Sequence, residues 1–115
     1  MRTDELLRFT LNDLADLKAV NIRPLDVQSF SPVADYMIIA TGNSSRHVRA
    51  IADNLLRKMK ERSVRMGSIE ADEDEEWVLV DLGDIVVHVM QQQTRDFYNL
   101  EKLWAPQNEK KAVLA

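Results

Sequence analysis

The sequence contains no cysteine, only three glycines and three prolines, and no apolar run that approaches the length of a membrane span. Without cysteine the chain can form no disulfide, thiolate nucleophile, iron–sulfur cluster or ordinary structural zinc site. A membrane-spanning helix needs about 20 consecutive apolar residues, and the N-terminal residues 1–5 lack the apolar core of a secretory signal. We therefore expect a cytoplasmic protein that contacts no membrane.

Positive charge is also in short supply, since 15 Lys and Arg residues stand against 19 Asp and Glu residues, a formal net charge of −4. A protein that wraps nucleic acid needs a basic surface to neutralise phosphates. We therefore predict no direct DNA binding and at most a peripheral contact with RNA. The 115 residues, of which 45% are hydrophobic, suit one globular domain with its own core. We place this domain at 1–105 and a tail at 106–115.

Hydrophobic periodicity divides the domain into helices and strands. Helical spacing predicts three helices, over 3–19, from 45 to before Gly67, and over 95–104. Strand patterns cover 25–28, 36–41, 66–70, 77–82 and 85–90. Helices that alternate with strands, with a hairpin near the end, predict an α/β domain with a mixed sheet flanked by helices.

The hairpin is the most readable segment, because Gly83-Asp84 forms a two-residue turn of the II′ kind. This turn sets the register of the two strands and places three aliphatic pairs on one face, which must be core: Leu82 with Ile85, Val80 with Val87, and Val78 with Val89. The other face then pairs Asp81 with Val86, Leu79 with His88, and Trp77 with Met90.

The segment from Gly42 to His47 joins a strand to a helix, a place where anions and nucleophiles are often bound. A nucleophile elbow would need a glycine where Arg46 stands, and the Walker and dinucleotide-binding glycine patterns are absent. Serine as the helix N-cap is the favoured interpretation. The alternative is a nucleotide-binding or nucleotidyltransferase-like enzyme that uses this turn.

No other constellation predicts catalytic residues, a metal site or a cofactor. The two histidines, His47 and His88, fall on different elements, and two ligands without cysteine do not complete a zinc site. The acidic block 70–76 lacks the spacing of a calcium loop. Asp81 and Asp84 lie on a strand face and in a turn, so they do not converge. The composition of the acidic block 70–76 predicts a solvated loop that repels nucleic acid and attracts a basic protein surface.

The second face of the hairpin supplies the candidate partner-binding residues. An exposed tryptophan beside a methionine and an acid is typical of a protein–protein anchor, although a covering helix would make the same residues part of the core. Tyr98 lies off the apolar stripe of the last helix, which is formed by Phe97, Leu100 and Trp104. It could therefore extend the candidate surface around the tryptophan. The predicted partner-binding residues are Trp77, Asp81, His88, Met90 and Tyr98.

Three blocks of the sequence, in this order, match a known pattern: DYMIIATGNSSRHV at 35–48, WVLVDLGDIVVHVM at 77–90 and RDFYNLEKLW at 95–104. Together they resemble the ribosomal silencing factor (RsfS) family, also called Iojap-like. The resemblance extends over nearly the whole chain up to Trp104.

This resemblance implies a protein that binds the large ribosomal subunit through ribosomal protein uL14, blocks joining of the small subunit, and represses translation under nutrient limitation. It also implies a homodimer with a nucleotidyltransferase-like fold. No Asp-x-Asp pair follows the Gly42–Ser45 turn on a later strand, so transferase chemistry is not carried over by likeness of fold. We therefore predict that the protein is not an enzyme.

Overall fold

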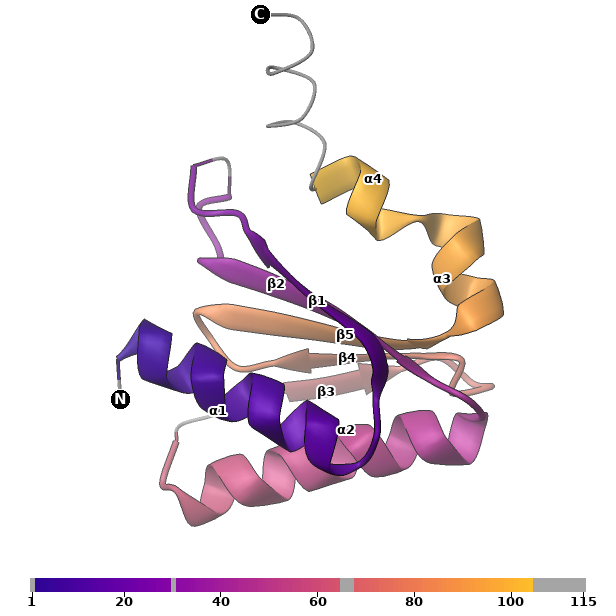
Figure 1. Ribbon diagram of the computed structural model, residues 1–115, viewed down its shortest axis with the longest axis horizontal. Coiled ribbons are helices and arrows are strands. Elements are labelled where there is room, and N and C mark those ends of the chain that lie inside the picture. The colour runs from indigo at the N-terminus through magenta and orange to yellow at the C-terminus, as the bar shows by residue number, and fades with distance from the viewer. Residues whose placement is uncertain (1, 30, 65–67, 105–115) are drawn as a thin grey trace, which may run out of the picture.

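The computed structural model describes residues 2–29, 31–64 and 68–104, which form one mixed sheet with helices on both faces (Figure 1). The strands are β1 (Val20–Asp26), β2 (Tyr36–Gly42), β3 (Ser68–Ala71), β4 (Trp77–Asp81) and β5 (Ile85–Gln91), in the order β1-β2-β5-β4-β3. Only the central β2–β5 pair among these five strands is parallel. The predicted α/β domain with a mixed sheet is confirmed, and the predicted tail at 106–115 lies outside the described residues.

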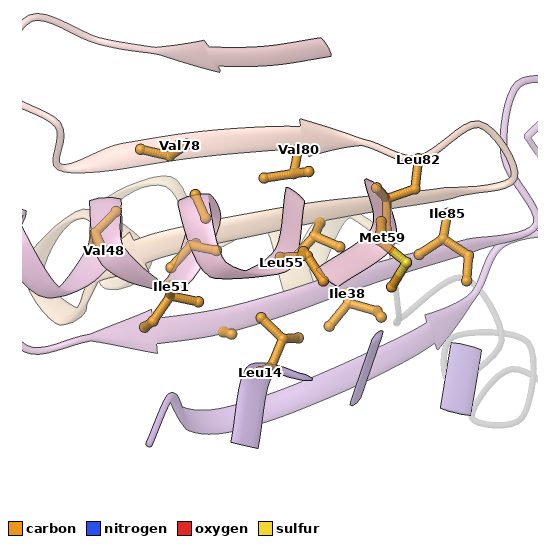
Figure 2. Close-up of a cluster of buried hydrophobic side chains, with 14 of the residues drawn as sticks. Leu14, Ile38, Val48, Ile51, Leu55, Met59, Val78, Val80, Leu82 and Ile85 are labelled. Atoms are coloured by element: carbon orange, nitrogen blue, oxygen red, sulfur yellow. The ribbon is translucent and has the colours of Figure 1, made fainter. Parts of the chain in front are cut away.

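Helices α1 (Thr3–Asp16) and α2 (Ser45–Glu61) cover one face of the sheet (Figure 1). The aliphatic face of the β4–β5 hairpin packs there against α2, whose buried side chains include Ile51, Leu55 and Met59 (Figure 2). The observed strand pairing is the predicted one, with Val80 opposite Val87. All six residues of the predicted core face are buried.

The turn between β2 and α2 depends on Ser44 and Gly42. The Oγ atom of Ser44 accepts a hydrogen bond from the backbone N–H of His47 at 3.0 Å, which is the predicted N-cap. A side chain at Gly42 would place its Cβ 2.8 Å from Cγ2 of Val48. Glycine therefore allows α2 to start directly against the end of β2.

The N-terminal elements differ from the prediction in their bounds. Helix α1 ends at Asp16 rather than at 19, because Lys18 has a positive φ of 60° that turns the chain toward β1. Thr3 is the first helical residue, and Arg2 occupies the N-cap without a side-chain hydrogen bond. Strand β1 begins at Val20 instead of 25. Its first residues are mostly exposed and include an irregular register between Val20 and Arg23, which hides the strand pattern.

The C-terminal segment also differs, since the helix predicted over 95–104 is two helices, α3 (Gln92–Tyr98) and α4 (Leu100–Trp104). Asn99 between them has a left-handed φ of 49°, a conformation that ends α-helices. Strand β3 covers Ser68–Ala71 instead of 66–70, and residues 66 and 67 lie outside the described residues.

Helices α3 and α4 lie on the face of the sheet opposite α1 and α2 (Figure 1). Arg95 anchors α3 there, because its buried guanidinium donates to Oγ1 of Thr41 and to the carbonyl of Asn21, both at 2.8 Å. It also pairs with Glu101 of α4. A second apolar cluster forms on this face from Leu25, Val27, Ala34, Met37, Ile39 and Met90, with Trp77, Val86 and Leu100 packed against it.

Candidate protein-docking site

Three aromatic side chains form a continuous surface group, which we call the aromatic patch: Trp77, Phe97 and Tyr98. The ring centroids of Trp77 and Tyr98 lie 4.8 Å apart, and the ring of Phe97 meets that of Tyr98 edge-on at 5.0 Å. Phe97 is 80% exposed and Tyr98 is 50% exposed. Large aromatic side chains that remain exposed in a contiguous group mark an interaction surface.

The patch exists because α3 follows β5 with no intervening loop. Strand β5 ends at Gln91 and α3 starts at Gln92, so the end of α3 is brought back to the start of the neighbouring strand β4. Trp77 is the first residue of β4. The topology therefore joins one end of β4 to Phe97 and Tyr98, which lie far from Trp77 in the sequence.

His88 fixes the indole of Trp77 through a hydrogen bond. Its Nδ1 atom accepts a hydrogen bond from Nε1 of Trp77 at 2.9 Å, and its own side chain is only 6% exposed. Burial lowers the pKa of His88 from 6.5 to about 4, so the ring is neutral at pH 7 and Nδ1 is free to accept. A neutral imidazole has one acceptor nitrogen, hence Nε2 carries the proton.

Two hollows with acidic rims flank the aromatic patch. One of about 270 Å³ is lined by Glu70, Ala71, Asp72, Trp77 and Leu79. The other, of about 330 Å³, is lined by Glu76, Gln93, Thr94, Phe97 and Tyr98. The patch therefore combines apolar anchors with carboxylates, a composition suited to a basic protein surface.

Comparison with known proteins places the chain in a family. The family model "Ribosomal silencing factor during starvation" matches residues 1–114. The chain belongs to the ribosomal silencing factor (RsfS) family. A curated RsfS protein of Halalkalibacterium halodurans is 40% identical, with both chains covered completely. The resemblance read from the three sequence blocks is thus confirmed.

The RsfS fold is also seen in a solved structure. A crystal structure of a Chromobacterium violaceum protein superposes with a TM-score of 0.88 at 41% identity, covering 91% of this chain and 88% of that one. A more distant relative is the mouse protein named "Mitochondrial assembly of ribosomal large subunit protein 1", which is 35% identical. That match covers 76% of this chain and 41% of the mouse protein.

Two predicted partner-binding residues of this RsfS chain do not lie on the surface. Met90 is fully buried in the second apolar cluster, to which Leu100 of α4 contributes. The prediction that Met90 belongs to an exposed face is wrong, because α3 and α4 cover the sheet at this point. His88 is likewise buried, so it supports Trp77 rather than meeting a partner directly.

Asp81 lies on the predicted face but at the edge of the site. It is four residues along β4 from Trp77, about 13 Å at the usual rise of a strand. Its Oδ1 atom accepts a hydrogen bond from the N–H of Gly83 at 2.8 Å, which stabilises the hairpin turn. Asp81 is therefore placed to support the turn and to contribute charge from the rim.

Phe97 is the functional candidate that sequence reasoning missed. The spacing of Phe97, Leu100 and Trp104 predicts one apolar stripe on a continuous helix, whereas the helix breaks at Asn99. Leu100 is half-buried, whereas Phe97 faces solvent. The signal that could have revealed this is asparagine after two aromatic residues, since asparagine tolerates the left-handed conformation that ends a helix.

The Gly42–His47 turn uses its polar side chains within the fold. Besides the Ser44 cap, Oγ of Ser45 donates to the carbonyl of Asp74 at 2.9 Å. Nδ1 of His47 accepts from the N–H of Asn43 at 2.9 Å, and its Nε2 donates to the carbonyl of Leu17 at 2.7 Å. These contacts link the turn to α1 and to the loop before β4, which is a structural role.

No group of three or more His, Cys, Asp or Glu side chains is arranged to hold a metal ion in the part of the chain that the structure describes. Within the same residues, no helix combines the length and apolar character needed to cross a membrane.

Proposed function

We propose that this RsfS-family protein binds the large ribosomal subunit by docking the aromatic patch on ribosomal protein uL14, and so blocks joining of the small subunit. Translation is then repressed when nutrients are limiting. The observation that carries this proposal is the contiguous, exposed group of Trp77, Phe97 and Tyr98 on a chain of this family. Buried aromatic anchors supply most of the binding energy in many interfaces.

The charge of the surface favours a protein contact over an RNA contact. Glu70, Asp72 and Glu76 line the hollows beside the patch, and the whole chain has a formal charge of −4. Carboxylates repel the phosphates of ribosomal RNA and attract lysine and arginine side chains. A negatively charged protein can therefore approach the ribosome where a basic protein, rather than RNA, forms the surface.

The size of the domain supports steric exclusion as the mechanism. The molecule extends over 44 × 33 × 22 Å, and the proposed inhibition needs no chemical step. A body of this size, held on a subunit face that must make close contact, prevents that contact while it stays bound. The dissociation rate then determines how long a subunit remains silent. We include in this proposal a cytoplasmic location and the homodimer that the family resemblance implies.

The test measures large-subunit binding and subunit joining with purified components. Phe97→Ala removes the most exposed ring of the patch, whose only ring partner among the described residues is Tyr98. We expect it to weaken co-sedimentation with large subunits about tenfold, equivalent to about 1.4 kcal/mol, and to restore joining in proportion. Val33→Ala is the matched control, because Val33 is 77% exposed and lies in the β1–β2 connection. Equal binding by both variants would contradict the proposal.

A further inference from the structure

We propose that the hollow on one face of the paired strands β3 and β4, lined by Glu70, Ala71, Asp72, Trp77 and Leu79, receives a single arginine side chain of the protein partner. This inference rests on the proposed docking function and deepens it. We call this feature the β3–β4 hollow.

The walls of the β3–β4 hollow suit the aliphatic and planar parts of arginine. Leu79 offers apolar surface for the methylene stem, as long cationic side chains prefer. Trp77 offers an aromatic ring, and a guanidinium within about 6 Å of such a ring is attracted by its electrons. The hydrogen bond from Nε1 of Trp77 to His88 fixes the orientation of this ring before any partner arrives.

The rim of the hollow supplies two carboxylates. Glu70 is paired with Leu79 across the β3–β4 ladder, so both side chains lie on the same face of the sheet. The Oδ1 atom of Asp72 accepts hydrogen bonds from the backbone N–H groups of Glu76, at 2.9 Å, and of Trp77, at 3.4 Å. These bonds hold the Asp72 carboxylate in place beside the tryptophan.

The two rim carboxylates retain unused acceptor capacity. Within the described residues, no hydrogen bond or ion pair engages the Glu70 carboxylate or the Oδ2 atom of Asp72. By contrast, the nearby Glu75 pairs with Arg49 at 3.5 Å. Arginine matches this arrangement better than lysine, because its planar guanidinium can stack on the ring and bond to a carboxylate with two N–H groups.

A nuclear magnetic resonance titration of the ¹⁵N-labelled full chain tests the inference with defined probes. The probe is acetyl-Gly-Arg-Gly-amide, and the control is the same peptide with citrulline, which has nearly the same shape without the charge. We expect the arginine peptide to shift the Trp77 indole N–H signal and the amide signals of Glu70 and Leu79 saturably. The citrulline peptide should bind at least fivefold more weakly.

Two isosteric variants locate the effect within the acidic block. Glu70→Gln should weaken binding of the arginine peptide at least threefold. Glu73→Gln removes the same charge from an exposed position of the same block that does not line the hollow, and it should change binding less than twofold. Equal effects of the two variants would show a general charge attraction and overturn the assignment. A lysine peptide that binds as tightly as the arginine peptide would overturn the choice of arginine.

The arginine-site proposal and the docking proposal can fail independently of each other. If no peptide shifts these signals while Phe97→Ala still weakens large-subunit binding, the β3–β4 hollow is not an arginine site and the docking proposal stands. If the arginine peptide binds at the hollow but the protein does not co-sediment with large subunits, docking fails and the site remains. Glu70→Gln should also weaken subunit binding more than Glu73→Gln does.

Discussion

The two faces of the sheet carry similar apolar side chains but have different roles. On β4, Val78 and Val80 are completely buried under α2, whereas the alternate residues Trp77, Leu79 and Asp81 are half-buried. The second face is covered by α3 and α4 near Met90 and is more open toward β3. A strand that buries one face fully and the other in part can stabilise the fold with the first and present a binding surface with the second.

The largest expected effect tests the assignment of the two faces. Val80→Asp places a carboxylate in the fully buried cluster and should cost several kcal/mol, enough to unfold the domain. Leu79→Asp is the matched control, because it puts the same charge one residue away on the half-buried face, and it should cost much less. Thermal melting by circular dichroism measures both. Similar melting temperatures for the two variants would reverse our view of the faces.

A second prediction concerns the buried His88 and the pH dependence of stability. Its pKa is lowered from 6.5 to about 4 by burial, so the unfolded chain takes up a proton more readily than the folded chain. The corresponding stability, about 3 kcal/mol, is present above pH 6.5 and is lost as the pH falls toward 4. Denaturant unfolding between pH 7 and pH 4.5 should show this loss. His88→Gln should reduce the loss, and an unchanged pH profile would contradict it.

A third prediction distinguishes a loss of large-subunit binding from a loss of stability for residues on the second face of the sheet. Trp77→Ala and Tyr98→Ala should each weaken large-subunit binding tenfold or more, about 1.4 kcal/mol, because aromatic residues at the centre of an interface dominate its energy. Both variants should remain folded, since neither residue is fully buried. Co-sedimentation and circular dichroism are measured on the same samples. A Trp77→Ala variant that melts as low as Val80→Asp would identify Trp77 as a core residue.

The smallest expected effect on large-subunit binding concerns the β2–α2 turn. Replacing Ser44 and Ser45 together by alanine removes the N-cap and the contact with Asp74, and should cost about 1–2 kcal/mol of stability. Large-subunit binding should stay within twofold of wild type. Complete loss of binding by a folded double variant would move the functional site to this turn and revive the nucleotide-binding alternative.

The exposure of side chains at the candidate site is predictable where the signals are local. Strand alternation predicts that Trp77 is not in the main core, and the position of Tyr98 off the helical stripe predicts that it is exposed; the structure agrees with both. Met90 and Phe97 differ from the prediction in opposite directions: Met90 is buried because α3 and α4 cover it, and Phe97 is exposed because residues 95–104 do not form one continuous helix. The left-handed conformation of Asn99 changes which side chains of this segment reach the sheet.

The β4–β5 register and the aliphatic core face follow from the sequence by itself. A two-residue turn and a strict two-residue alternation leave one pairing that buries Val78 and Val80. The tertiary structure decided how the second face is used. Whether Trp77, His88 and Met90 are exposed depends on where α3 and α4 pack, and that position is held by the contacts of Arg95 with Thr41, Asn21 and Glu101. The contacts with Thr41 and Asn21 join residues far apart in the chain, and no local pattern encodes them.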